Sequence, residues 1–385
     1  MESAFQYNHY VTGKQFIGRL AELKAFSDLV ARGEHIVLYE PPKTGITSLI
    51  QQAFYTMRTA GEQFVTIPVS LLGIRSAEQL TLRLASCAIL ASGSTPDEYA
   101  SAATELLAGT HLIYDEARYK ADGAVISASW QLDDSDLQAV FLLPWRLGER
   151  SGIRHIVVLE EFQNVQLTED GDHICRLLET LFKRIPEPLA GKAVYVFTGS
   201  SVNAMHEIFG VKRWLWRQVT RIQLPPLQTK ELVEHVIRGF LVSGKVIDRG
   251  LASGACELLK NNVWYVNHLH AICDSLSRGY IMEQTLQQAL SSLIAVHEPR
   301  FRATMSDLTT FQLSLLQAVL DGHTRFSSAE VIRRYGLNSS ANVRRLKDAL
   351  CKKEIITFDD NDDPVILDPL FEYWIRKYYF NPTLL

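Results

Sequence analysis

The feature that most constrains this chain is a short apolar run that ends in a tight polar loop and continues into a helical pattern. The run is His35-Ile-Val-Leu-Tyr39, the loop is Glu40-Pro-Pro-Lys-Thr-Gly-Ile-Thr-Ser48, and helical apolar spacing starts at Leu49. A buried strand, such a turn and a helix form the setting in which main-chain N–H groups bind phosphate. An ordinary strand-to-helix turn with a threonine N-cap is the alternative interpretation of the same residues.

Three further apolar runs have the length and composition of buried strands. They cover residues 63–72, 153–159 and 193–197, and segments with helical spacing, such as residues 20–31, lie between the strand-like runs. The long segment 76–148 is predicted to be mostly helical. Strands that alternate with helices predict an α/β fold with a parallel sheet, in which functional groups gather at the carboxyl ends of the strands.

Polar residues follow the last two of these strands. Glu160 and Glu161 come directly after one run, and Thr198 and Ser200 follow the next. A buried strand that ends in two acids is the Walker B pattern, in which the first acid holds Mg²⁺ and the second orients the attacking water. We therefore expect Glu160 to be a metal ligand and Glu161 to be catalytic. Thr198 is expected to contact a terminal phosphate or water, with a helix N-cap as the alternative.

The loop after the first strand differs from a standard P-loop at two positions. The P-loop pattern is G-x-x-x-x-G-K-[ST], and Gly45 and Thr47 set the register, so Glu40 stands at the first glycine and Ile46 at the lysine. The predicted nucleotide-binding residues of the loop are Lys43, Thr44, Gly45, Ile46, Thr47 and Ser48. Thr47 is also a predicted Mg²⁺ ligand.

These differences weaken the predicted site without removing it. Without the lysine, the site lacks a charge-assisted hydrogen bond of about 1.5–3 kcal/mol, which is about ten- to 150-fold in affinity. Repulsion from the Glu40 carboxylate adds about 3–4 kcal/mol at an effective dielectric near ~20, unless that side chain turns to solvent. Lys43 starts too early in the loop to replace the lysine. We expect ATP or ADP with Mg²⁺ to bind weakly or not at all, and efficient hydrolysis to be absent.

The character of the sequence changes near Leu224-Pro-Pro226. Residues 228–300 have helical spacing and no strand-like run, which predicts a small helical domain. From about Ser306 the pattern is three helices followed by two short strand-like runs, residues 354–358 and 364–367. Three helices and a hairpin are typical of a winged helix.

Charge gives little support for a general nucleic-acid binder. The chain has 39 Lys and Arg against 43 Asp and Glu, a net charge of −4, and residues 306–385 hold ten basic and eleven acidic residues. The helix expected at residues 340–352 nevertheless carries Arg344 and Arg345, and such a helix is suited to a major groove. Docking to a protein and binding to DNA both stay open for this region.

Composition and cysteine spacing are those of an intracellular globular protein. Hydrophobic residues make up 47% of the chain and charged residues 21%, and the five cysteines lie far apart without a metal-ligand spacing. The first ten residues lack the apolar core of a secretion signal, and no apolar run is long enough to cross a bilayer. We expect a cytoplasmic protein with reduced cysteines.

Short motifs in a fixed order give the chain a resemblance to a known family. They are Phe16-Ile-Gly-Arg-Leu-Ala-Glu-Leu23, Thr198-Gly-Ser-Ser201, Asn262-Val-Trp-Tyr265, Asp307-Leu-Thr-Thr-Phe-Gln312 and Asp368-Pro-Leu-Phe-Glu-Tyr-Trp374. With the degenerate Walker A loop, they resemble the AAA+/STAND P-loop ATPases with a C-terminal winged helix found in archaeal and Bacteroidetes genomes. The resemblance implies that Gly18 and Arg19 lie near the adenine. It also implies a catalytic arginine-finger role for Arg217, in the basic stretch after the fourth strand.

The predicted architecture has three parts. Residues 1–224 are expected to form a P-loop NTPase core with a parallel sheet, residues 225–300 an α-helical lid, and residues 301–385 a winged-helix domain. The resemblance implies an ATP-binding switch, in which nucleotide biases the arrangement of core and lid and the winged helix passes that bias to an unidentified protein partner. A pseudo-ATPase scaffold without enzymatic activity, or a winged-helix module for protein or DNA, is the alternative. Assembly into a homo-oligomer stays open.

Overall fold

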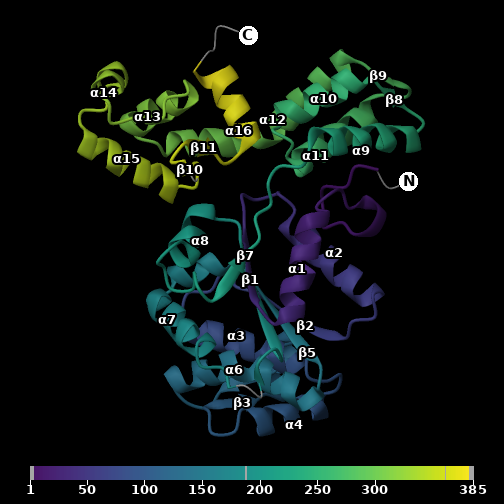
Figure 1. Cartoon of the computed structure of the whole chain (residues 1–385), viewed down its shortest axis with the longest axis vertical. Coiled ribbons are helices and arrows are strands. Elements are labelled where there is room, and N and C mark those ends of the chain that lie inside the picture. Colours follow the sequence, from purple (N-terminus) through teal and green to yellow (C-terminus); the bar gives the residue numbers. More distant parts are fainter. Residues whose placement is uncertain (1–3, 187–188, 360, 381–385) are drawn as a thin grey trace. The chain divides into compact units, whose positions relative to one another are not determined.

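A computed structural model describes residues 4–186, 189–359 and 361–380 of the chain. The chain divides into two compact units, each described here by itself (Figure 1). The sheet unit consists of Leu20–Glu40 and Gln52–Leu224, and the lid–wing unit consists of Met1–Arg19, Pro41–Gln51 and Pro225–Leu385. Residues 41–48 of the predicted phosphate-binding loop therefore belong to the lid–wing unit. Glu160 and Glu161, the acids predicted at the end of a strand, belong to the sheet unit.

The sheet unit is built on five parallel strands in the order β2-β5-β6-β1-β7. The strands are β1 (His35–Tyr39), β2 (Phe64–Ser70), β5 (Arg154–Glu160), β6 (Ala193–Gly199) and β7 (Val219–Arg221). The middle strands are buried on both faces, which explains why they are continuous apolar runs in the sequence. The predicted parallel α/β sheet is confirmed. The edge strand β7 is not predicted, because three residues are too few to show a strand pattern in the sequence.

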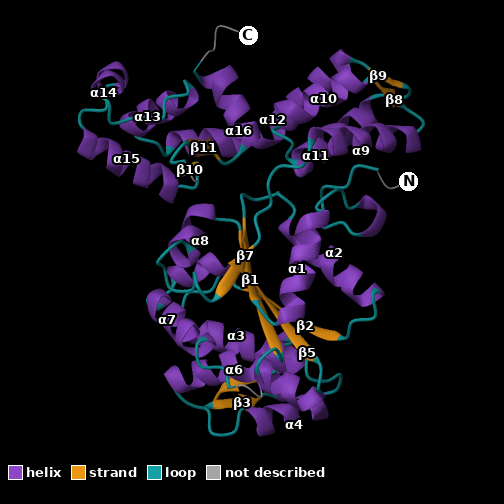
Figure 2. Cartoon of the chain, viewed as in Figure 1, coloured by secondary structure: helices purple, strands orange, loops and turns teal. Residues whose placement is uncertain are grey.

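Helices cover the sheet, with α1 and α8 on opposite sides of β1 (Figure 2). The helices of this unit are α1 (Leu20–Arg32), α3 (Ala77–Leu90), α4 (Pro96–Leu106), α5 (Glu116–Asp122), α6 (Asp134–Ser151), α7 (Gly171–Phe182), α8 (Val202–Phe209) and the 3₁₀ helix η2 (Phe162–Leu167). Helix α2 (Ile46–Thr59) begins in the lid–wing unit and continues into the sheet unit. Burial lowers the pKa of His35 to about 4, and its neutral ring packs among Trp145, Phe182 and Tyr195.

An antiparallel hairpin lies in the segment between β2 and β5. It consists of β3 (Leu112–Tyr114) and β4 (Ile126–Ala128), with α5 as its connection. The expectation of a mostly helical segment over residues 76–148 is therefore incomplete. Strands of three residues are too short to show the alternation by which a strand is recognised in a sequence.

The lid part of the lid–wing unit is helical. Its helices are α9 (Thr229–Val242), α10 (Arg249–Leu258), α11 (Val263–Leu276) and α12 (Glu283–Ser306). Two strands of two residues each, β8 (Val246–Ile247) and β9 (Tyr280–Ile281), pair in parallel. The expectation that residues 228–300 contain no strand is wrong at these four residues, because the pairing is set by the ends of neighbouring helices and not by a local run.

The winged helix predicted at the end of the chain is confirmed. It consists of α13 (Thr310–Leu320), α14 (Ala329–Tyr335), α15 (Ser340–Lys352), the antiparallel pair β10 (Ile356–Phe358) and β11 (Pro364–Ile366), and α16 (Pro369–Trp374), which continues as one π-helical turn (Ile375–Tyr379). One buried core runs through the lid and the winged helix together. No helix in the described ranges is both long and apolar enough to span a membrane. None of the five cysteines, all of them in these ranges, forms a disulfide.

The start of the chain is part of the lid core. Phe5 is 1% exposed, and its ring lies 4.8 Å from that of Phe240, centroid to centroid. A Cβ atom at Gly239 would lie 2.6 Å from the Phe5 ring, so this position accepts only glycine while Phe5 is in place. The Asn267 side chain donates a hydrogen bond of 2.8 Å to the carbonyl of Gln6. Beyond this segment, a 3₁₀ turn, η1 (Gly13–Gln15), precedes α1.

Replacing Phe5 with alanine is expected to destabilise the lid–wing unit. Loss of a fully buried phenyl ring leaves a cavity among apolar neighbours, and the free energy of unfolding should fall by about 3–5 kcal/mol. Guanidinium unfolding followed by hydrogen exchange of α9 and α11 measures this change. Tyr10→Ala is the matched control, since Tyr10 is 53% exposed and its loss should change stability by about 0.5 kcal/mol or less. Equal losses of stability from the two substitutions would contradict the placement of Phe5 in the core of the lid.

Candidate functional site

The loop between β1 and α2 is closed by its own hydrogen bonds. The Thr44 hydroxyl donates to the carbonyl of Pro41 at 2.9 Å, and the amide of Leu49 donates to the carbonyl of Gly45 at 3.0 Å. Lys43 has a φ of +73° and Gly45 a φ of +96°, so the backbone turns sharply before the helix starts at Ile46. The first amides of α2 have no acceptor within the helix by geometry, which leaves them available to an anion.

Lys43 is turned toward aromatic rings of α11. Its ammonium nitrogen lies 3.8 Å from the ring centroid of Trp264 and 5.2 Å from that of Tyr265. Burial lowers the pKa of Lys43, and the nearby charge of Arg300 lowers it further. No carboxylate of the described ranges forms an ion pair with this ammonium group, although the charge of the more distant Asp368 opposes the lowering of its pKa. The ring faces are therefore its close electrostatic contacts.

Two histidines beside Lys43 have buried ring nitrogens that lack a hydrogen-bond partner among the described residues: Nδ1 of His268 and Nε2 of His297. Burial lowers the pKa of both rings, that of His297 to about 4, and Lys43 contributes to each shift. Both imidazoles are therefore neutral at pH 7. A buried polar nitrogen without a partner costs about 1–3 kcal/mol, which a ligand or water at this place recovers.

Asp368 connects this group to the winged helix. Its carboxylate accepts hydrogen bonds from the Tyr265 hydroxyl at 2.9 and 3.0 Å and from Arg300 at 2.7 Å. It also caps the first turn of α16 through the amides of Leu370 and Phe371. Tyr265, one of the two aromatic residues that contact Lys43, is therefore bonded to the cap of α16.

Gly18 and Arg19 lie against the start of the lid. Gly18 has a φ of +60°, and a Cβ atom there would lie 2.7 Å from the Glu231 carboxylate. The Arg19 guanidinium donates to the carbonyl of Pro225 at 2.5 Å. Ser48 is also in this unit, where its hydroxyl accepts from the amide of Val11 at 3.1 Å.

The carboxyl edge of the sheet brings three of the predicted site residues into one region: the predicted metal ligand Glu160 and the predicted catalytic residues Glu161 and Thr198. Glu160 ends β5, and both its partial burial and the adjacent charge of Glu161 raise its pKa. Glu161 has a φ of +55°, and its carboxylate accepts from Ser200 at 2.6 Å and from the side-chain amide of Gln163 at 2.5 Å. Thr198 is buried near the end of β6. Thr47 belongs to the other unit, so its predicted joint role with Glu160 as a metal ligand stays a prediction.

Glu40 stands at the first glycine position of the P-loop pattern, and its side chain makes polar contacts within the sheet unit. Its carboxylate accepts from the amide of Leu224 at 3.0 Å and lies 3.8 Å from the Arg221 guanidinium, which stacks 3.9 Å from the ring centroid of Tyr39. Arg217, the predicted arginine finger, is exposed and lies over the Trp216 ring at 4.7 Å. Its catalytic role stays a prediction.

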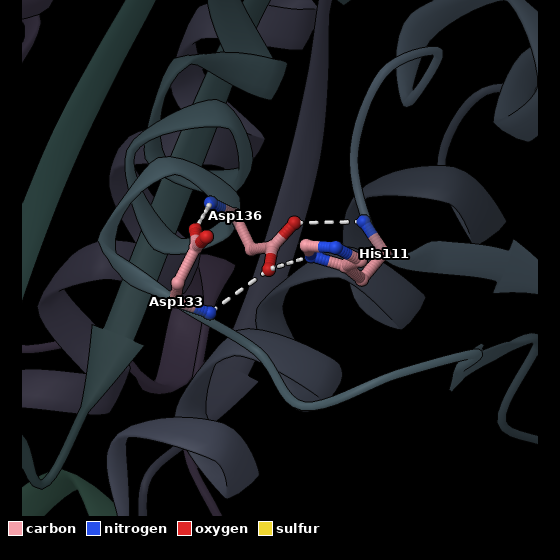
Figure 3. Close-up of side chains that lie close together, drawn as sticks. All are labelled: His111, Asp133 and Asp136. Carbon is pink, nitrogen blue, oxygen red and sulfur yellow. Dashed lines mark hydrogen bonds and ion pairs between the residues drawn. The ribbon is translucent and has the colours of Figure 1, made fainter.

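A separate polar cluster lies at the start of α6 (Figure 3). The fully buried carboxylate of Asp136 accepts from the amide and ring Nδ1 of His111 at 2.8 and 2.9 Å, and from the amide of Asp133 at 2.9 Å. Asp133 caps the same helix through the Asp136 amide. Although the three side chains are close enough to share a metal ion, these bonds already use the Asp136 carboxylate to join the loop before β3 to α6. We assign the cluster a structural role.

Comparison with solved structures identifies the class of fold. The chain is similar to the Walker-type ATPase of Pyrococcus abyssi, with a TM-score of 0.65 and 17% identity over 97% of this chain and 100% of that one. It also matches the Aeropyrum pernix ORC2 protein in ADPNP and ADP complexes, with a TM-score of 0.49 and 12% identity over 97% of both chains. The A. pernix ORC1 protein in complex with DNA matches with a TM-score of 0.48 and 12% identity, over 96% of this chain and 95% of that one.

Sequence comparison adds the C-terminal domain. Residues 299–377 match a family model described as a probable winged helix domain. No curated protein matches the chain. The chain therefore has the fold of a Walker-type P-loop ATPase followed by a winged helix, which confirms the expected fold class and the resemblance to P-loop ATPases with a winged helix.

Sequence reasoning did not find the partners of the unusual loop residues. Trp264, Tyr265 and Asp368 are part of motifs that carry the family resemblance, but no contact with Lys43 or between these residues is predicted from them, and Arg300 is not singled out. The Asp-Pro pair at the start of α16 is a recognisable cap signal, but its bond to Tyr265 joins residues far apart in the sequence. Such a contact has no local pattern.

The fold is expected to be stabilised at acidic pH by His111. The hydrogen bond with Asp136 raises the pKa of His111, so the folded state favours the protonated ring. This stabilisation is fully present below the unfolded pKa of about 6.5 and is lost as pH rises through the higher folded pKa. The difference in unfolding free energy between the wild-type protein and His111→Gln should shrink as the pH rises above about 6.5 and through the higher folded pKa. The exposed His9→Gln serves as control, and a difference that stays constant or grows with pH contradicts the prediction.

Proposed function

We propose that this protein is a nucleotide-responsive switch that binds ATP or ADP with Mg²⁺ weakly at the loop between β1 and α2 and hydrolyses ATP slowly or not at all. The observation that carries the proposal is the position of Lys43 over Trp264, with no ion pair to any described carboxylate and beside two unsatisfied imidazole nitrogens. A phosphate group offers this ammonium a charge-assisted hydrogen bond, which is stronger than a contact with a ring face.

Anion binding at the loop rests on backbone groups and on these side chains. The first-turn amides of α2 supply N–H donors, and a neutral imidazole supplies one more from whichever nitrogen carries the proton. The Glu40 carboxylate, bound to the Leu224 amide and close to Arg221, brings less repulsion than an isolated charge would. These features support binding despite the isoleucine at the lysine position.

Slow hydrolysis follows from the parts that differ from an efficient ATPase. Ile46 supplies no charge to the outer phosphates, and Lys43 stands three residues before the lysine position, too early in the loop to replace that lysine. Thr47 and Glu160 are the proposed Mg²⁺ ligands, and Glu161 and Thr198 the proposed groups for water and phosphate. Because the charge-assisted hydrogen bond of a P-loop lysine is missing from the bound state and from the transition state, affinity and turnover are both reduced.

The switch works through a chain of contacts inside the lid–wing unit. Lys43 contacts Trp264 and Tyr265, Tyr265 donates to Asp368, and Asp368 caps α16 of the winged helix. A nucleotide that draws Lys43 away removes a cation–π interaction of about 0.5–2 kcal/mol, which is about two- to 30-fold in a conformational equilibrium. A nucleotide shifts the equilibrium between the arrangements with and without the Lys43–Trp264 contact only as far as its affinities for these two arrangements differ. The proposed recipient of the change is a protein partner at the winged helix.

Substituting Ile46 with lysine is expected to raise the affinity for ATP–Mg²⁺ by about ten- to 150-fold, because it restores the missing charge-assisted hydrogen bond. Isothermal titration of the full chain measures the affinity, and wild-type protein should release heat at millimolar ATP. Ile46→Met is the matched control without charge. Glu40 is not substituted in this experiment, because its carboxylate accepts a hydrogen bond from the Leu224 amide.

The proposed effect of nucleotide on the contact between Lys43 and Trp264 of the lid is tested with the same full-length protein. ATP should change the fluorescence of Trp264, obtained as the difference between wild-type protein and Trp264→Phe, and Lys43→Met should abolish the change. Lys14→Met, which removes an exposed lysine, should leave it intact. No heat at millimolar ATP for the wild-type protein and Ile46→Lys alike would leave the pseudo-ATPase scaffold as the function.

A second candidate function is DNA binding by the winged helix, favoured by the exposure of basic residues on two of its helices. Arg333 and Arg334 on α14 and Arg344 and Arg345 on α15 are all exposed. Lys347 is instead engaged, 3.9 Å from the Phe358 ring centroid and 3.6 Å from Asp362. The four arginines can reach phosphates or base edges without breaking an ion pair among the described residues.

Replacing both Arg344 and Arg345 with alanine is expected to weaken duplex DNA binding. Removing one arginine–phosphate ion pair reduces the slope of log affinity against log salt by about 0.9. Gel shift with random duplex DNA between about 50 and 200 mM salt measures this. The control replaces Arg249 and Arg302, two exposed arginines of the lid, with alanine. If wild-type protein does not shift DNA even at low salt, the winged helix is a protein-docking module.

A further inference from the structure

A cavity of about 420 Å³ lies in the sheet unit, between α3 and the turn that follows α5. Its lining comes from residues 73–124, so it contains none of the residues assigned above to nucleotide or metal. This volume is within the range of about 300–1,000 Å³ typical of small-molecule sites. Nothing in the proposed switch uses this cavity.

Arg83 is the dominant charge in the cavity wall. One of its terminal nitrogens donates to the carbonyls of Ser70 and Leu72 at 2.7 and 2.9 Å, which fixes the guanidinium in place. A guanidinium has five N–H donors, so three stay available after these two bonds. In the described part of the chain, no carboxylate lies within ion-pair distance of Arg83. A half-buried, fixed and uncompensated guanidinium is a suitable anchor for an anion.

A second arginine and a thiol share the wall with Arg83. Arg118 donates to the carbonyl of Ile126 at 2.9 Å, and its remaining charge faces Asp122 across 3.6 Å. Cys87 lines the same cavity as Arg83, and burial raises the pKa of its thiol while the charge of Arg83 acts in the opposite direction. With two arginines and one aspartate, the wall carries a net charge of +1.

The rest of the wall is largely apolar. Leu82 and Leu90 flank the charged groups on α3, and Ala124 lies opposite them on the turn after α5. Arg83, Cys87 and Leu90 follow helical spacing, so one face of α3 presents an anchor at one end and an apolar surface at the other. A ligand that matches this wall has one negative charge and an apolar body.

We propose that this cavity binds a small organic monoanion, with its carboxylate on Arg83 and its apolar body against Leu82 and Leu90. A dianion is disfavoured because Asp122 offsets the charge of Arg118. A neutral ligand of the same shape leaves the donors of Arg83 without an acceptor, which costs affinity.

The test compares 2-naphthoate with the uncharged 2-naphthamide by isothermal titration against the full-length protein. The carboxylate should bind at least about ten-fold more tightly, the effect of one charge-assisted hydrogen bond. Arg83→Gln should abolish this preference, and Ala124→Leu should reduce binding of both compounds by filling the cavity. Arg150→Gln removes an exposed arginine of the same unit and should change nothing.

Alkylation of Cys87 by iodoacetamide, followed by mass spectrometry of its peptide, locates the ligand. Naphthoate should slow this reaction at least about five-fold at saturation, without slowing alkylation of Cys351 in the winged helix. Equal binding of acid and amide overturns the choice of an anion. Absence of naphthoate binding at millimolar concentration, or binding that leaves Cys87 unprotected and Ala124→Leu unaffected, overturns the site itself. If Arg83→Gln fails to fold, Ala124→Leu and Cys87 protection still decide between these outcomes.

Discussion

The proposed switch depends on a lysine ammonium group that lies over the faces of two aromatic rings in the lid–wing unit. Lys43 gives up part of its hydration to lie over Trp264, and the lowered pKa of its amine reflects that loss. Ring quadrupoles return only about 0.5–2 kcal/mol for such a contact. The interaction is strong enough to place the loop and weak enough for a phosphate to replace it, which is the property that a reversible switch needs.

The carboxyl edge of the sheet is ordered in a different way. Glu161 sits in a left-handed backbone conformation that costs about 1–3 kcal/mol for a residue with a side chain, and two hydrogen bonds hold its carboxylate. Ser200 supplies one of those bonds from the position directly after β6. In the proposed function this edge supplies the groups for metal and water, while Ile46 stands at the position of the loop lysine. The proposal therefore assigns nucleotide binding and turnover to different parts of the chain.

The fold could be predicted from the sequence where elements are long and buried on both faces. Strands such as His35–Tyr39 and the three helices of the winged helix show clear apolar patterns, because local spacing and tertiary burial agree in them. The short paired strands β8 and β9 could not be predicted, since two residues are too few to show the alternation of apolar and polar residues in a strand. The surroundings of Glu40 and Lys43 were also out of reach. Their partners, Leu224 and Trp264, lie about 180 to 220 residues away, and only the folded chain brings them together.

The route of the chain has a consequence for dividing the protein into fragments. Because the lid–wing unit takes its material from Met1–Arg19, Pro41–Gln51 and Pro225–Leu385, the backbone passes between the two units at four places. Cutting after Leu224 does not release either unit intact: the C-terminal piece lacks the phenyl ring of Phe5 that fills its core, and the N-terminal piece keeps an orphaned loop. The two units therefore alternate along the sequence, and a single cut in the backbone cannot yield both of them complete.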